Sequence, residues 1–201
     1  MKLIALCGAA GAGKDTVADL LPARKLAFAD TLYREVAEAW GVEQHVLRCR
    51  ETKETPLPAL IVNACPDDDF VGFALDEHCH STAIPWVNDP RSPRQILQWW
   101  GNYRRAQDPD YFVARTWQTL CEHMMRDESI VLTDVRFQNE AAMVRQLGGQ
   151  IWQIRRPGYE AGGTGHASDT DGSEFAPDLV VTNGGSLEDL QATVLAAWEG
   201  V

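Results

Sequence analysis

A glycine-rich turn near the N-terminus has the residue pattern best suited to chemistry. The segment GAAGAGKDT at 8–16 matches the spacing G-x-x-x-x-G-K. It follows a short apolar segment and precedes one with helical spacing, so it predicts a loop between a buried strand and a helix. In such a loop the glycines let backbone N–H groups approach a phosphate chain, and Lys14 adds a positive charge. A merely flexible turn explains this combination less well.

The residues after Lys14 depart from the usual pattern. A Ser or Thr hydroxyl that binds Mg²⁺ normally follows the lysine, but this chain has Asp15 there, and Thr16 comes one residue later. Thr16 could take the metal role, as in the GKGT form of adenylate-kinase-like enzymes. Asp15 could bind Mg²⁺ through water, or it could simply favour the helix N-terminus. The sequence leaves these two explanations of Asp15 open.

A second candidate acid follows the apolar segment at 129–133. Asp134 and Arg136 lie in TDVR at 133–136. In a parallel sheet the carboxyl ends of the strands meet at one edge, so Asp134 is expected on the same edge as Gly8. It could hold the metal's hydration shell or orient an acceptor, with Arg136 in the same crevice. Alternatively, Asp134 caps the next helix.

Five positions with helical spacing form a polar stripe within 91–105. Steps of three and four residues put them on one helix face, and they are Arg91, Arg94, Gln98, Gly101 and Arg105. Arginine binds phosphate through two nitrogens, glutamine can contact a base edge, and glycine leaves room. The stripe therefore suggests a second anion site. A solvated basic face is the alternative.

Two weaker patterns remain. The tract EHCH at 77–80 contains metal-ligating residue types, but it lacks a second ligand pair at a finger-like spacing. The segment 156–175 is rich in Gly, Ser, Thr and Asp and is interpreted as a lid loop. Arg155 and Arg156 at its start could clamp phosphates or a nucleotide base, or be surface charges, and we favour the clamp. His166 and Ser168 in this loop do not indicate a hydrolase, because no G-x-S-x-G is present.

The order of elements predicts one α/β domain with a central parallel sheet of about five strands and helices on both faces. Strands are expected at 2–7, 25–28, 129–133, 150–155 and 179–182, and helices at 14–21, 31–40, 92–105, 109–126, 139–147 and 186–198. The expected core comprises 1–44 and 127–201, with a helical acceptor-binding insertion at about 45–126. Residues 52–90 are interpreted as partly irregular because of their prolines and acidic run.

Composition narrows the class of protein. The net charge of −11 argues against a surface for nucleic acid polymers. The sequence has neither an apolar run long enough to span a membrane nor a signal peptide, so a cytoplasmic protein is expected. The five cysteines are scattered, which fits free thiols in a reducing compartment. An exposed apolar helix could pair two chains as a homodimer.

Several motifs occur in an order typical of one family. They are GAAGAGKDT at 8–16, FAD at 28–30, PRQILQWWGNYRR at 93–105, TDVRFQNEA at 133–141 and H-x-S-D at 166–169. Together they resemble the deoxynucleoside monophosphate kinases of bacteriophages. They are similar, more distantly, to other nucleoside monophosphate kinases and to phosphomevalonate kinases with a GKD loop. The resemblance covers nearly the whole chain except about 45–90.

The resemblance implies a three-layer P-loop fold and Mg²⁺-dependent transfer of phosphate from ATP to a deoxynucleoside monophosphate. Such an enzyme would work in the cytoplasm, that of the host if a phage encodes it. Lys14, Arg136 and Asp134 would be catalytic. ATP would contact Gly8, Gly11, Ala12, Gly13, Lys14, Asp15, Thr16 and Arg155, with Asp15 or Thr16 toward the metal. The acceptor would contact Asp30, Arg94, Gln98, Gly101, Arg105 and Arg136.

Asp169 stands where this family often has Glu, which leaves its role open. Two other functions compete with the one implied. One is a P-loop kinase for another phosphorylated metabolite, of the phosphomevalonate or dephospho-coenzyme A type. The other is a regulatory protein that binds a nucleotide without transferring phosphate. No guanine-specific N-K-x-D motif is present.

Overall fold

Strand β1 (Leu3–Cys7) is buried along its whole length in the computed structural model, which describes residues 1–78, 84–158 and 175–201. Its first, third and fifth residues contribute to one apolar cluster, and its second and fourth to another. Side chains alternate across a strand, so the two clusters lie on opposite faces. A continuous apolar run such as LIALC is what a parallel strand covered on both faces requires.

Five parallel strands form the sheet, in the order β2-β3-β1-β4-β5. The four strands around β1 are β2 (Arg24–Leu26), β3 (Ile130–Leu132), β4 (Gln150–Arg155) and β5 (Leu179–Thr182). Ile4 is in register with Val131 on one side and with Gln150 on the other. Because all strands run the same way, the loops after β1, β3, β4 and β5 leave from one edge of the sheet.

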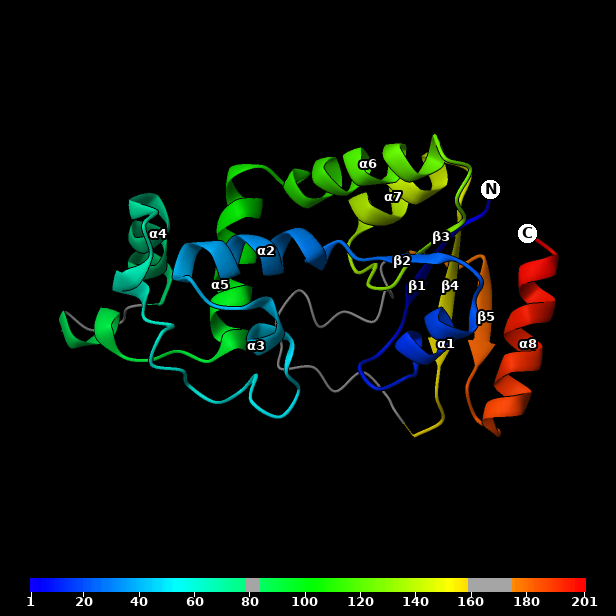
Figure 1. The fold of residues 1–201 in the computed structure, drawn as a ribbon, viewed down its shortest axis with the longest axis horizontal. Helices are drawn as coiled ribbons and strands as arrows, with labels where there is room; N and C mark the ends of the chain where they lie inside the picture. The colour runs from blue at the N-terminus through cyan, green and yellow to red at the C-terminus, as the bar shows by residue number, and fades with distance from the viewer. Residues whose placement is uncertain (79–83, 159–174) are drawn as a thin grey trace. The chain divides into compact units, whose positions relative to one another are not determined.

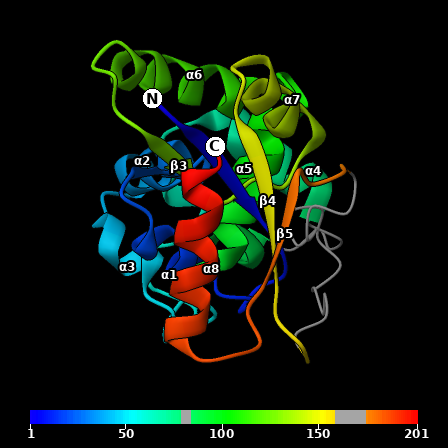
Figure 2. The same cartoon turned by 90° about the vertical axis from the view of Figure 1, so that its right-hand side faces the viewer.

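Helices cover both faces of this sheet. Helices α1 (Lys14–Leu20) and α8 (Leu187–Glu199) pack on one face, and they lie next to each other in Figure 2. Helices α7 (Gln138–Gln146) and α6 (Tyr111–Met124) pack on the other, seen together at the top of Figure 1. The predicted three-layer α/β fold with a five-stranded parallel sheet is confirmed. No helix in the described ranges is both long and apolar enough to cross a membrane.

The chain divides into two compact units. The first comprises residues 1–28 and 113–201 and contains the sheet, and the second comprises residues 29–112. The second unit contains α2 (Ala29–Trp40), α3 (Gln44–Arg48), η1 (Val62–Ala64), α4 (Asp68–His78), η2 (Ile84–Asn88) and α5 (Pro93–Gln107). Its boundaries differ from the 45–126 expected for the insertion. Helix α2 belongs to it because Val36, Ala37 and Trp40 are part of its apolar cluster.

Aromatic side chains form the centre of the second unit. Phe70 of α4 contacts Trp40, Trp100 and Tyr103, with ring centroids 5.0 to 5.5 Å apart. Helix α4 lies in the stretch 52–90, which was interpreted as partly irregular and for which the sequence analysis named no helix. The acidic run starts the helix, since Asp67 Oδ1 accepts a hydrogen bond of 2.9 Å from the Phe70 N–H.

Helix α5 begins at the N-cap that the sequence predicted. Ser92 Oγ accepts from the Gln95 N–H at 3.3 Å, and the Gln95 side chain accepts from the Ser92 N–H at 3.0 Å. This reciprocal pair is a capping box, and Pro93 at the first helical position adds to it.

We expect Ser92→Ala to lower the free energy of unfolding by about 1 kcal/mol, because it leaves the Gln95 N–H in the first turn of α5 without its acceptor. Urea denaturation would measure the change, with Thr55→Ala as an exposed control in the same unit. A loss no larger than that of Thr55→Ala would mean that the cap does not stabilise α5.

Candidate functional site

The loop between β1 and α1 has the geometry of a phosphate cradle. Gly8, Gly11 and Gly13 have φ angles of +134°, +80° and +101°, which only glycine adopts without strain. A Cβ on Gly8 would lie 2.3 Å from the Ile154 carbonyl oxygen, and one on Gly13 would lie 2.4 Å from Asn183 Nδ2. Gly8 and Gly13 are therefore required both by the backbone conformation and by close contact with the ends of β4 and β5, and Gly11 by its conformation.

Lys14 folds back over this loop. Its Nζ donates hydrogen bonds to the carbonyl oxygens of Gly8 at 2.6 Å and Ala9 at 3.0 Å. The ammonium is thus held against the loop's own backbone.

Electrostatics connect Lys14 with the two residues predicted at the end of β3. Burial lowers the pKa of Lys14 from its ordinary value, and the Arg136 cation lowers it further, while Asp15 and Asp134 act in the opposite direction. Lys14, Asp134 and Arg136 are therefore close enough to interact. This is the arrangement that the shared sheet edge predicted, within the first unit.

Asp134 fixes the backbone beyond β2. Its Oδ1 accepts a hydrogen bond of 2.8 Å from the Phe28 N–H. In the first turn of helix α7, Glu140 Oε2 accepts from the N–H groups of Arg136 at 2.8 Å and Phe137 at 3.1 Å. Glu140 thus contributes to the start of α7.

The two candidate metal ligands stand in the first turn of α1. Asp15 is exposed and Thr16 is partly buried. Within the residues that the structure describes, no three His, Cys, Asp or Glu side chains gather around one point. The carboxylate and hydroxyl oxygens of this turn are hard ligands of the kind Mg²⁺ prefers.

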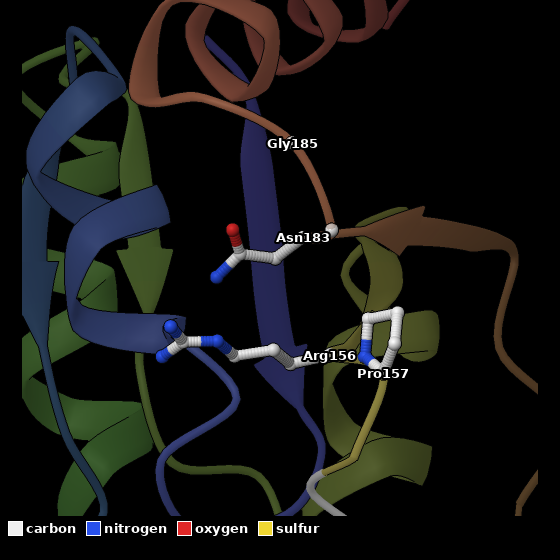
Figure 3. Close-up of a pocket in the computed structure, with 5 residues that line it drawn as sticks. Arg156, Pro157, Asn183 and Gly185 are labelled. Atoms are coloured by element: carbon white, nitrogen blue, oxygen red, sulfur yellow. The ribbon is translucent and has the colours of Figure 1, made fainter.

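A hollow of about 140 Å³ opens near this loop (Figure 3). It is lined by Arg156, Pro157, Asn183, Gly184 and Gly185. The Asn183 amide and the Arg156 guanidinium extend in the same direction in Figure 3.

The Nε of Arg155, the predicted nucleotide contact, donates to Gln153 Oε1 on the same strand at 2.8 Å. The lining residues Asn183 to Gly185 were missed from the sequence. A polar and glycine-rich turn directly after a predicted strand was the available signal.

The predicted acceptor residues all lie in the second unit, apart from Arg136. On α5, the Arg94 Nε forms a salt bridge with Glu54, and the Arg94 side chain is 28% exposed. Gln98, one turn further, has an Nε2 atom that is buried and makes no hydrogen bond within the described part of the chain. A buried amide without a partner is costly, so this atom is suited to a ligand oxygen.

The remaining arginines near the stripe have different surroundings. The Arg105 guanidinium lies over the Phe112 ring, 4.8 Å from its centroid. A Cβ on Gly101 would lie 3.0 Å from Arg105 Nη1, so the glycine makes room for this side chain. Arg91 lies before the helix, where its guanidinium stacks on Trp86 at 4.4 Å. Only four of the five stripe positions are therefore on α5 itself.

Arg104, adjacent to the stripe, is part of the packing of the second unit. Its Nε lies 3.4 Å from Glu35 Oε2, and its guanidinium is within 5.2 Å of the ring centroids of three aromatic residues. Asp30, the other predicted acceptor contact, accepts a hydrogen bond of 2.8 Å from Arg48, whose guanidinium stacks on Tyr33.

Parts of two sequence patterns fall outside the described residues. They are Cys79 and His80 of the EHCH tract, and the segment 159–174, which includes most of the expected lid with His166, Ser168 and Asp169. Of the tract's described residues, His78 stacks on Trp99 with a centroid distance of 4.4 Å.

Comparison with known proteins gives one relative that spans nearly the whole chain. No protein-family model matches. The chain is 28% identical over 213 residues to "Putative deoxynucleotide monophosphate kinase" of Acanthamoeba polyphaga mimivirus, an alignment that covers 98% of this chain and 95% of that protein. It is 29% identical over 108 residues to "Uncharacterized protein ORF76" of Ictalurid herpesvirus 1, covering 52% of this chain and 45% of that one.

A solved structure resembles the whole chain in fold. The crystal structure of TT1252 from Thermus thermophilus matches with a TM-score of 0.50 and 16% sequence identity, over 100% of this chain and 97% of that one. At this identity the likeness concerns the fold alone.

Proposed function

We propose that this protein is an ATP-dependent kinase that transfers a phosphoryl group to a deoxynucleoside monophosphate, giving a deoxynucleoside diphosphate and ADP. The observation that carries the proposal is the glycine cradle with Lys14 folded over it and Arg136 and Asp134 within electrostatic range. The mimivirus relative, whose name is that of a deoxynucleotide monophosphate kinase, supports the acceptor class.

The donor side of the proposal rests on the first unit. The positive-φ glycines set the backbone conformation of the loop, and a Cβ at Gly8 or Gly13 would collide with Ile154 or Asn183 and force the loop out of that conformation. Thr16, or Asp15 through water, would hold Mg²⁺, which when bound neutralises phosphate charge. Arg156 in the adjoining hollow is suited to contact the base or ribose of ATP, a role we assign to it in place of Arg155.

The acceptor side rests on the second unit. Arg94 supplies a guanidinium for the acceptor phosphate, and the buried Gln98 amide supplies a donor for a base edge. Asp30, Gly101 and Arg105 complete the proposed set. Arg104 is excluded from it, because Glu35 and three aromatic rings occupy its guanidinium.

In the proposed reaction the protein needs to do little to activate the acceptor. An acceptor phosphate oxygen is already a nucleophile, so catalysis consists of positioning and neutralising charge. Lys14 and Arg136 would stabilise the negative charge on the transferring group. Asp134, by fixing the Phe28 backbone, would keep the end of β3 in place beside them.

An ADP-release assay with Mg²⁺ and ATP against a panel of acceptors tests this function. The panel comprises deoxynucleoside monophosphates, the matching ribonucleotides, mevalonate phosphate and dephospho-coenzyme A. We expect rapid turnover with at least one deoxynucleotide, faster than with its ribonucleotide. Turnover with only a non-nucleotide acceptor, or slow ATP hydrolysis that no acceptor stimulates, would contradict the proposal.

A further inference from the structure

The turn after β5 is tied directly to the glycine loop. Asn183 Nδ2 donates a hydrogen bond of 2.9 Å to the Ala12 carbonyl oxygen. The Asn183 backbone N–H donates to the Arg155 carbonyl at 2.7 Å, which anchors the residue to the end of β4. The space that a Cβ on Gly13 would need is occupied by the same Nδ2 atom, at 2.4 Å. Asn183 therefore contacts the last two residues of the loop, Ala12 and Gly13, and holds them in place.

The peptide plane makes this contact relevant to anion binding. The Ala12 carbonyl and the Gly13 N–H belong to one planar trans peptide, since the chain has no cis peptide bond in its described residues. In a trans peptide the C=O and N–H vectors point in opposite directions. A donor that holds the Ala12 oxygen on one side therefore aims the Gly13 N–H toward the other side. Gly13, with φ of +101°, directly precedes Lys14.

We propose that Asn183 is a positioning residue for the phosphate chain of the nucleotide: by holding the Ala12 carbonyl, it fixes the direction of the Gly13 N–H that binds phosphate. This inference rests on the proposed function, because it assumes that the loop binds a nucleotide. Asn183 acts through the backbone and needs no contact with the phosphates.

The residue type fits this role. Holding a carbonyl requires a donor, and the asparagine amide supplies one on a side chain short enough to fit beside Gly13. Aspartate has nearly the same shape but presents only acceptors when ionised, so its oxygen would face the Ala12 oxygen. Leucine is similar in size and has neither donor nor charge. These two changes separate loss of the hydrogen bond from the effect of an added negative charge.

Isothermal titration with ADP, tripolyphosphate and adenosine tests the inference without depending on phosphoryl transfer. We expect Asn183→Asp and Asn183→Leu to weaken ADP and tripolyphosphate about tenfold, the size of losing one aligned hydrogen bond to a charged group. Adenosine affinity should change by no more than about twofold, because the inference places the effect of Asn183 on the loop and not on the hollow that it also lines. Asn63→Asp is the control, because Asn63 is an exposed asparagine paired with Asn88 at 3.3 Å.

The outcomes separate this inference from the proposed function. Wild-type protein that binds none of the three ligands would overturn the proposed function itself. Wild-type binding that survives unchanged in both variants would overturn the role of Asn183 alone. Equal weakening of ADP and adenosine would mean that Asn183 acts on the hollow and not on the loop. If both variants unfold, Asn183→Ser replaces them, because serine keeps a donor on a smaller side chain. This variant should lose more affinity for tripolyphosphate than for adenosine. Equal losses of affinity for the two ligands would contradict the inference.

In steady-state kinetics the same variants should raise the KM for ATP and leave the KM for the acceptor unchanged. A residue that only stabilises the fold would lower the melting temperature without this selectivity. The thermal melt of each variant is therefore measured beside its kinetics.

Discussion

Lys14→Met is expected to lower phosphoryl transfer by about 10³-fold or more, the scale of removing a charge that stabilises a transferring phosphoryl group. The Lys14 ammonium is held by two loop carbonyls beside the Arg136 cation, and burial lowers its pKa. An incoming polyphosphate would give this partly desolvated cation a strong partner. Methionine keeps the length and the apolar contacts of the side chain but cannot neutralise phosphate charge.

The fold should persist in this variant. Lys14→Met removes the two bonds from Nζ to the loop carbonyls, but the φ angles of the glycines and the bond from the Asn183 amide remain to hold the loop. Lys25→Met is the matched control, because Lys25 is an exposed lysine of the same unit paired with Asp19. Coupled ADP release measures turnover, and circular dichroism follows the fold. Turnover near that of Lys25→Met would remove Lys14 from the catalytic set and with it the main support for a kinase.

The sheet was predictable because each of its strands can be recognised from a short contiguous segment of sequence. Runs such as LIALC and IVL are apolar at every position, and only burial on both faces accounts for that. The glycine loop was predictable for the same reason, since its spacing and its flanks are contiguous. Helix α4 was missed because prolines and an acidic run precede it. The acidic run proved to be its N-terminal cap, with Asp67 accepting from Phe70.

The sequence predicted the parts of the site that lie within single segments, but few of the contacts between residues far apart in the chain. The grouping of Lys14 with Asp134 and Arg136 followed from the parallel topology. In the structure both residues are close enough to Lys14 to affect its pKa. Asn183 was missed because its contact with Ala12 joins residues 171 positions apart. Likewise, the sequence indicated that Arg94 could bind phosphate but not that Glu54, forty residues earlier, already pairs with it. Such pairings depend on tertiary structure, which spacing does not encode.

The pairing of Arg94 with Glu54 leads to two linked expectations for the acceptor. Arg94→Ala should raise the KM for the deoxynucleoside monophosphate about 10- to 100-fold, the size of losing a charge-assisted hydrogen bond to phosphate. The KM for ATP should change by no more than about twofold, the ordinary effect of a surface substitution. Arg34→Ala, an exposed arginine of the same unit, is the control. Equal effects on both substrates would place Arg94 outside the acceptor site.

Glu54→Gln should lower the KM for the acceptor, the opposite of the effect expected for Arg94→Ala. An acceptor phosphate that binds Arg94 competes with the Glu54 carboxylate for its guanidinium, so removing the Glu54 charge should lower the acceptor KM up to about fivefold, the upper range for a pair this exposed. Glu51→Gln is the matched control, because Glu51 lies in the same segment but accepts from Cys49. In the Arg94→Ala background, Glu54→Gln should have no further effect, because the two residues act through one contact. If Glu54→Gln lowers the KM equally with and without Arg94, the carboxylate repels the acceptor directly and does not compete for the arginine.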